Sequence, residues 1–241
     1  MRPVSEQLSS DFGVIEPLQT ANTVQGQIDE LKRAIEEFAA TPVVLAGWSW
    51  GAWLSYLLAA QEALLVRKLI LISSGPFDPE YAEGIMKTRL SRMSERERDR
   101  VEEIMSLLHA GGASSSVFKE FGAIIDRADS YDPIVHNDAD DLDLSEFGPD
   151  IYEKVWPEAD AMRRAGSLIE AGRKIVCPVT AIHGDYDPHP AAGVSKPLSM
   201  VLSDFKFVLL AHCGHRPWYE KEAVEAFYRL LRQELQHPPR S

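Results

Sequence analysis

The chain has 241 residues, 45% of them hydrophobic, which suits one large α/β domain or a core domain with an insertion. Its formal net charge of −12 argues against nucleic acid and anionic membrane as partners. No stretch approaches about 18 uninterrupted apolar residues, as a transmembrane helix would need, and the first residues lack a signal-peptide core. We therefore expect a cytoplasmic protein, with Cys177 and Cys213 as buried free thiols rather than a disulfide framework.

Short apolar runs alternate with helical patterns at the start of the chain, which is typical of βαβ units in a parallel sheet. Thr23 can cap a helix whose apolar residues recur at helical spacing. The expected strands are 12–17, 43–46 and 68–73, and the expected helices are 24–38 and 52–62.

This alternation stops between about residues 78 and 172, where helical patterns continue without a convincing strand. The helical segments are 91–108, 117–128 and 151–169, and they predict a helical insertion on the sheet domain. The acidic run 137–143 lacks the glycine and glutamate spacing of an EF-hand, so a solvated loop is favoured over a calcium site.

Alternation returns in the last part of the chain. Strands are expected at 175–182 and 205–210, followed by a closing helix at 218–235. The predicted fold class is therefore α/β, with a mostly parallel sheet of about five strands and an inserted helical segment.

The pentapeptide Gly47-Trp48-Ser49-Trp50-Gly51 joins one of the predicted strands to the following helix. A tight strand-to-helix turn of this kind lifts the serine hydroxyl to the sheet edge and favours small residues two positions away on either side. The helix N-terminus behind the serine also favours developing negative charge. The alternative interpretation is a glycine-flanked turn with a buried serine.

A serine nucleophile needs a neighbouring base, which a third group must orient. Open parallel sheets build their sites at the carboxyl ends of strands. Histidine and aspartate follow two predicted strands, in the segments 183–188 and 211–218. The resulting chain order of serine, aspartate and histidine is the order found in α/β-hydrolases.

On these motifs the chain resembles the α/β-hydrolase family, nearest to its proline iminopeptidase and esterase-like members with a helical cap. The resemblance implies a core domain of residues 1–77 and 173–241 and a cap of residues 78–172. In the family the acid lies three residues after a strand-ending glycine, which points to Asp187 rather than Asp185. The family histidine follows a glycine before the last helix, which points to His215.

The resemblance implies that Ser49 attacks a carbonyl, His215 transfers the proton and Asp187 holds the imidazole. The backbone N–H of Trp50 would donate to the oxyanion. Trp48 would help to line an apolar acyl pocket, whereas Trp53 is at least as well explained by core packing. No metal and no organic cofactor is implied.

Other polar residues near the two motifs compete for these roles. His183 is interpreted as structural, and His212 as structural or solvent-exposed. His189 lies next to the acid, where a surface-loop position is favoured over contact with substrate. Asp185 is expected to cap the local turn.

The chain departs from the family at its front. Family members have three more strands before the segment that begins here, and a His-Gly loop that supplies a second oxyanion donor. Residues 2–8 resemble the helix that follows that loop. The strands 12–17 and 43–46 would then pair directly, or a gap or a partner strand would lie between them. We hypothesise either a longer gene product, or that the two strands close up into a five-stranded sheet with impaired catalysis.

The leading expectation is a serine hydrolase that cleaves an ester, amide or peptide-like small molecule through an acyl-enzyme. The alternative is a weak or inactive hydrolase-fold protein that binds a ligand or a partner without a complete oxyanion hole. Dehalogenase and epoxide hydrolase chemistry is disfavoured because those relatives use aspartate where this chain has Ser49. An exposed sheet edge would favour a homo-oligomer.

Overall fold

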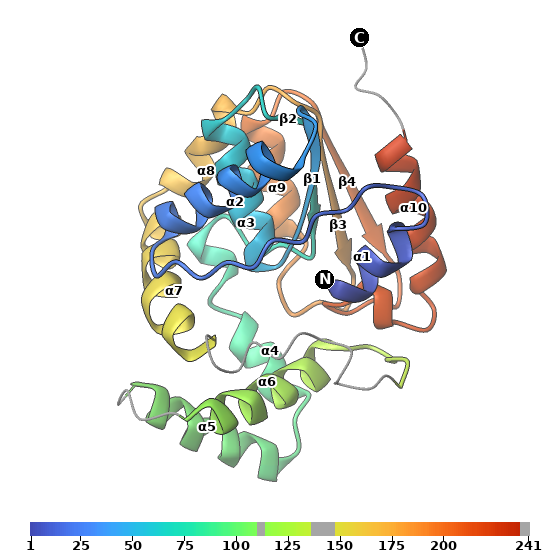
Figure 1. Ribbon diagram of the computed structural model, residues 1–241. Helices are drawn as coiled ribbons and strands as arrows, with labels where there is room; N and C mark the ends of the chain where they lie inside the picture. Colours follow the sequence, from blue (N-terminus) through green and yellow to red (C-terminus); the bar gives the residue numbers. More distant parts are fainter. Residues whose placement is uncertain (110–113, 136–147, 237–241) are drawn as a thin grey trace.

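The protein forms one parallel sheet with helices on both faces (Figure 1). The computed structural model describes residues 1–109, 114–135 and 148–236, so the acidic run 137–143 lies outside the described residues. Four strands pair in the order β1-β2-β3-β4, each parallel to its neighbour. They are β1 (Val43–Trp48), β2 (Val66–Ile72), β3 (Val179–Gly184) and β4 (Phe205–Leu210). All four carboxyl ends therefore meet at one edge.

The strands are buried by helices that differ between the two faces. Leu69 and Leu71 of β2 belong to the larger core with α2 and α3, whereas Ile70 and Ile72 pack on the other face with α1 and α10. This alternation follows from the two-residue period of a strand. The helices of the sheet domain are α1 (Arg2–Leu8), α2 (Val24–Phe38), α3 (Trp50–Gln61), α9 (Ala192–Val201) and α10 (Val224–Gln236).

Helix α2 confirms the prediction from periodicity. The Thr23 side chain accepts a hydrogen bond from the backbone N–H of Gly26 at 3.0 Å, which caps the first turn. Val24, Ile28 and Leu31 lie on its buried face. A capped start and an apolar stripe are both local features, which is why the sequence predicts this helix well.

Helix α10 is tied to the sheet by an ionic cluster around Glu234. Its carboxylate contacts the ammonium groups of Lys68 at 2.6 Å and Lys206 at 2.8 Å, and the hydroxyl of Thr180 at 2.9 Å. Burial raises the pKa of Glu234, but hydrogen bonds from Lys206, Lys68 and Thr180 outweigh it and lower that pKa to about 2. The cluster joins α10 to β2, β3 and β4.

The amino-terminal segment differs from the prediction. Residues 12–17 form no strand, and β1 is therefore an edge strand of a sheet with four strands rather than about five. A groove of about 840 Å³ lies between this segment and β1, lined also by α1, α2 and α10. Direct pairing of the two segments is therefore wrong, and the structure shows a groove between them. Residues 12–17 have the local sequence pattern of a strand, but a strand forms only where a neighbouring strand supplies the hydrogen-bond ladder.

In the described residues between β2 and β3, the regular elements are helices. Figure 1 shows α5 and α6 away from the sheet, and they form a hydrophobic cluster of their own with residues such as Val101, Ile104 and Ile124. By contrast, Val155, Ala159 and Leu168 belong to the main core. The elements are η1 (Pro79–Tyr81), α4 (Ile85–Ser91), α5 (Glu95–His109), α6 (Ser115–Asp129), α7 (Gly148–Arg164), α8 (Ser167–Ala171) and η3 (Gly172–Lys174). The division into a core and a cap stays a prediction.

Three further observations complete the comparison with the sequence. Helix α9 was not predicted, and the closing helix begins with the short turn η4 (Pro217–Tyr219) before α10. Cys177 and Cys213 are free thiols, the first half-buried and the second buried. In the described ranges, no helix combines the length and the apolar character that crossing a membrane requires.

Candidate active site

Ser49 lies in the tight turn between β1 and α3. Its backbone has φ 54° and ψ −120°, a positive φ that is uncommon for a residue with a side chain. The turn is held by hydrogen bonds from Ser49 N–H to Ile72 O at 3.0 Å and from Ala52 N–H to Ser49 O at 3.1 Å. The Ser49 hydroxyl makes no capping hydrogen bond to the helix, so the local backbone does not occupy this oxygen.

The two glycines of the motif are not equivalent. A Cβ on Gly47 would lie 2.1 Å from the carbonyl oxygen of Gly51 and 2.6 Å from Ser55 Oγ. A Cβ on Gly51 would meet nothing within 4 Å. The prediction that the turn needs small residues on both sides is therefore correct for Gly47 and wrong for Gly51.

The acid loop follows β3 and packs directly against the loop that carries His215. A Cβ on Gly184 would lie 2.1 Å from the carbonyl oxygen of Cys213, so only glycine allows this approach. Tyr186 N–H donates to the same carbonyl at 2.9 Å, and the Asp185 carboxylate accepts from Cys213 N–H at 3.1 Å. Asp185 thus joins the two loops instead of capping its own turn.

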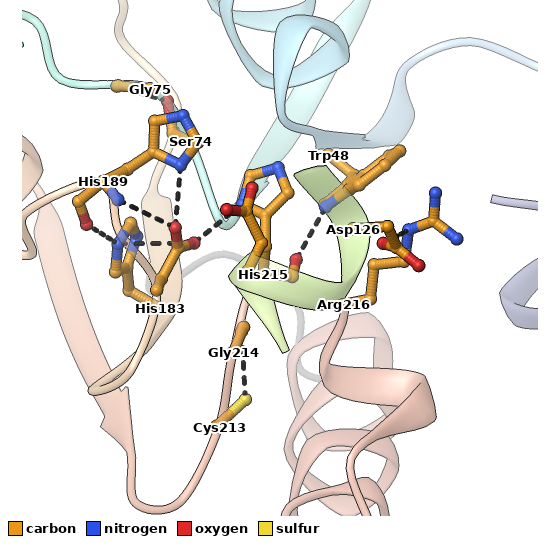
Figure 2. Close-up of polar contacts among 12 residues, drawn as sticks. Trp48, Ser74, Gly75, Asp126, His183, His189, Cys213, Gly214, His215 and Arg216 are labelled. Carbon is orange, nitrogen blue, oxygen red and sulfur yellow. Dashed lines mark hydrogen bonds and ion pairs between the residues drawn. The ribbon is translucent and has the colours of Figure 1, made fainter. Parts of the chain in front are cut away.

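Asp187 and His215 are bonded to each other. The distance between His215 Nδ1 and Asp187 Oδ2 is 2.8 Å, and both residues are buried. The backbone of His215 is fixed as well: its N–H donates to Asp129 O at 2.9 Å, and its carbonyl accepts from Trp48 Nε1 at 2.8 Å (Figure 2). The imidazole is therefore held by the acid, and the backbone that carries it is held by the end of α6 and by the last residue of β1.

The contact between Trp48 and His215 places His215 next to the residue that precedes Ser49. Trp48 immediately precedes Ser49, and its ring centroid lies 5.2 Å from that of His215. Within the described residues, the Ser49 hydroxyl forms no hydrogen bond with His215. The structure thus joins the acid to the histidine and places both beside the strand end that carries Ser49. A loose serine–histidine contact is common before substrate binds.

Two further histidines lie against the Asp187 carboxylate, which the sequence interpretation did not predict. His189 is half-buried against the acid rather than on an open surface loop: its Nδ1 lies 2.7 Å and its backbone nitrogen 3.0 Å from Asp187 Oδ1. His183, interpreted as structural, is fully buried with Nε2 2.7 Å from His189 O and 3.6 Å from Asp187 Oδ2. Figure 2 shows His183, His189 and His215 on three sides of one carboxylate. The only sequence signal for His189 was its position two residues after the acid.

These contacts determine the charge at the centre of the site. Burial raises the pKa of Asp187, but the neighbouring His215, His189 and His183 outweigh burial and hold that pKa well below its usual value. Burial lowers the pKa of His189, so its ring is neutral near neutral pH. The site therefore contains a carboxylate anion that accepts hydrogen bonds from imidazole N–H groups.

Asp187, His189 and His215 present ligand atoms within 4.8 Å of one another, which is the spacing of a cation site. The same atoms are already joined to each other by hydrogen bonds. Each of the three side chains therefore already has a hydrogen-bond partner within the group.

The tryptophans around the turn have distinct neighbours. Trp53 is buried and donates to Gly75 O at 3.1 Å, which confirms core packing. The indole of Trp50 donates to Gln27 Oε1 at 2.7 Å, and its backbone N–H opens α3, where the helix offers no acceptor. The predicted roles of Trp50 in the oxyanion hole and of Trp48 in substrate binding stay predictions. His212 is exposed and lies 3.8 Å from Glu222.

A family model described as "Alpha/beta hydrolase family" matches residues 11–230, which is most of the chain. The chain belongs to the alpha/beta hydrolase family. A parallel sheet, a serine at the strand-to-helix turn and the acid and histidine after the last two strands agree with this assignment.

Known proteins resemble this hydrolase at low sequence identity. A pimeloyl-[acyl-carrier protein] methyl ester esterase of Nitrosospira multiformis is 24% identical over 204 residues, which cover 80% of this chain and 69% of the relative. The crystal structure of VinJ aligns with TM-score 0.61 and 21% identity over 89% of this chain and 72% of its own. That of a proline iminopeptidase from Mycobacterium smegmatis aligns with TM-score 0.60 and 18% identity, covering 88% and 71%. At these identities the structural matches establish the fold.

Proposed function

We propose that this α/β-hydrolase is a serine hydrolase that cleaves an ester, amide or peptide-like small molecule through an acyl-enzyme on Ser49. The observation that carries the proposal is the 2.8 Å bond between Asp187 and His215 beside the strained turn of Ser49. The strained backbone at Ser49 costs conformational free energy, and a role as nucleophile would explain why the protein keeps it. A serine nucleophile needs a neighbouring base that a third group orients, and the bonded pair of His215 and Asp187 would supply both.

The hydrogen-bond pattern determines how the proton would move. Asp187 is an anion and accepts from His215, so Nδ1 carries the imidazole hydrogen and Nε2 is free to accept a proton. His215 Nε2 would take the proton of the Ser49 hydroxyl as oxygen attacks the carbonyl carbon, and would return it to the leaving group. Water then hydrolyses the acyl-enzyme by the same route. The backbone N–H of Trp50 would donate to the oxyanion.

The names of the relatives support acyl chemistry, and they differ in the bond that each one names. One relative is named as an ester-cleaving enzyme and one structural neighbour as an iminopeptidase. Esters and amides pass through the same tetrahedral intermediate, so one triad serves both. We keep the proposed substrate as a small molecule with an ester, amide or peptide-like bond.

A second candidate is a weak or inactive hydrolase-fold protein that binds a ligand or partner. The resemblance assigns no second oxyanion donor in this chain, and one observation favours this candidate: the groove beside β1 is lined by Trp48 and Gly51 of the turn that carries Ser49. Loss of one such donor lowers kcat by about 10²–10³-fold. The two candidates therefore differ in the reactivity of Ser49.

Covalent labelling with a fluorophosphonate, together with hydrolysis of p-nitrophenyl esters, separates the candidates. We expect the wild-type protein to be labelled and to turn over, and Ser49→Ala to lose both. Ser199→Ala is the matched control, since Ser199 is exposed and bonds only to Lys196 O. A folded wild-type protein that is not labelled would favour the binding protein, and equal turnover by Ser49→Ala would exclude Ser49 as the nucleophile.

A further inference from the structure

The two oxygens of the Asp187 carboxylate are divided between two imidazoles. Oδ2 lies 2.8 Å from His215 Nδ1, and Oδ1 lies 2.7 Å from His189 Nδ1. The serine–histidine–aspartate reaction needs only the first contact. His189 is therefore a half-buried titratable residue, bonded to the acid, that the proposed mechanism does not use.

We propose that His189 is a positioning residue of the active site, which holds the Asp187 carboxylate in the rotation that directs Oδ2 at His215. This inference rests on the proposed function of the same site. His189 does not touch the reacting atoms in this role; it acts through Asp187.

The backbone that carries the His189 ring is itself held in place. Its carbonyl oxygen accepts from His183 Nε2 at 2.7 Å, and a carbonyl cannot donate, so Nε2 carries the hydrogen of His183. His189 lies between Pro188 and Pro190, which restrict the backbone on both sides. A chain of contacts thus runs from His183 through His189 and Asp187 to His215 (Figure 2).

The second donor is useful because Asp187 is buried as an anion. A carboxylate in such a site is stabilised by each N–H that it accepts, and a carboxylate with donors on both oxygens cannot rotate freely. His189 N–H from the backbone, at 3.0 Å, supplies one donor to Oδ1 and the imidazole supplies the stronger one at 2.7 Å. Removal of the imidazole would leave Oδ1 with the backbone donor only.

The groups around His189 keep its imidazole neutral and able to donate to Asp187. Its ring centroid lies 4.6 Å from that of His215, so a positive charge on both rings would be unfavourable. The charged groups that act on His189 are Asp187, His215 and Arg89, and Arg89 is paired with Asp129. Burial, together with His215 and Arg89, outweighs the opposite effect of Asp187 and lowers the pKa of His189, so it remains a neutral donor when His215 accepts the proton.

Two amide substitutions test which nitrogen matters. Asparagine carries its amide nitrogen at the position of Nδ1, whereas glutamine carries it at the position of Nε2, away from Asp187. We expect His189→Asn to retain kcat within about threefold, and His189→Gln to lower kcat about tenfold with little change in KM, as for one charged hydrogen bond. The acid limb of the kcat/KM profile should move to higher pH in His189→Gln, because a carboxylate with fewer donors stabilises the protonated His215 more strongly.

His212→Asn is the matched control, since His212 is exposed on the neighbouring loop and asparagine tolerates its positive φ. Thermal unfolding of each variant shows that it is folded. Equal loss of kcat in the Asn and Gln variants, or unchanged kcat and pH profile in a folded His189→Gln protein, would overturn the positioning role.

A measurement in Ser49→Ala protein separates this inference from the proposed function. The proton shared by His215 Nδ1 and Asp187 should give a low-field ¹H NMR signal without any turnover. We expect His189→Gln to shift or broaden this signal and His189→Asn to preserve it. If the wild-type protein is not labelled but the signal responds in this way, only the proposed function fails. If labelling succeeds and the signal is indifferent to both variants, only the role of His189 fails.

Discussion

Gly47 offers the sharpest test of the strand-to-helix turn, because the structure separates it from Gly51. In Gly47→Ala, the new methyl would lie 2.1 Å from the Gly51 carbonyl oxygen and 2.5 Å from its carbonyl carbon. These are backbone atoms of the first turn of α3, so they cannot move aside like the end of a flexible side chain. The methyl can fit only if β1 and α3 separate.

The size of the effect follows from that contact. A carbon and an oxygen normally stay more than about 3 Å apart, so relief needs a backbone shift of about 1 Å in a packed region. Overpacking of this kind costs about 1–3 kcal/mol, and backbone contacts put Gly47→Ala at about 3 kcal/mol. Gly51 lies inside α3 with open space around it, so Gly51→Ala should gain up to about 1 kcal/mol from helix propensity.

Thermal and urea unfolding of the two variants, with fluorophosphonate labelling of Ser49, measure the difference. A protein of this size shifts in Tm by about 2–4 °C per kcal/mol, so we expect a fall of about 6–12 °C for Gly47→Ala and a small rise for Gly51→Ala. Labelling should be lost in the first variant and kept in the second. Two variants with equal stability and equal labelling would refute the steric argument.

Three further predictions concern the site and its support. Asp187→Asn should lower kcat/KM about 10³–10⁴-fold, since the amide no longer holds the correct imidazole tautomer; an unchanged rate would contradict the assigned acid. Trp48→Phe removes the donor to His215 O and should lower kcat about tenfold, and kinetics at saturating substrate measure this. The pKa of Glu234 falls from 4.5 to about 2, so its ionised form stabilises the fold above its unfolded pKa, and this contribution is lost as pH falls towards about 2. Glu234→Gln should therefore cost about 1–2 kcal/mol near neutral pH, discounted for the exposed Lys206, and urea unfolding should show the difference shrinking in acid.

Local patterns in the sequence were sufficient for most helices and strands. The apolar period and the cap at Thr23 predict α2, and the apolar run 68–73 predicts β2, because these signals lie within the element itself. The glycine–serine turn and the Ser, Asp, His order also indicated the family, since parallel strands bring their carboxyl ends together whatever the loops contain.

Tertiary structure decided what depends on residues distant in the chain. Residues 12–17 read as a strand but form none, because in the described part of the chain no strand lies in the groove between them and β1. A Cβ would have open space at Gly51 but would clash at Gly47, and His189 packs against Asp187 instead of lying on an open surface loop. Hydrophobic period and turn chemistry report the preferences of a short segment, whereas strand pairing, steric clearance and shared hydrogen bonds exist only once separate segments meet.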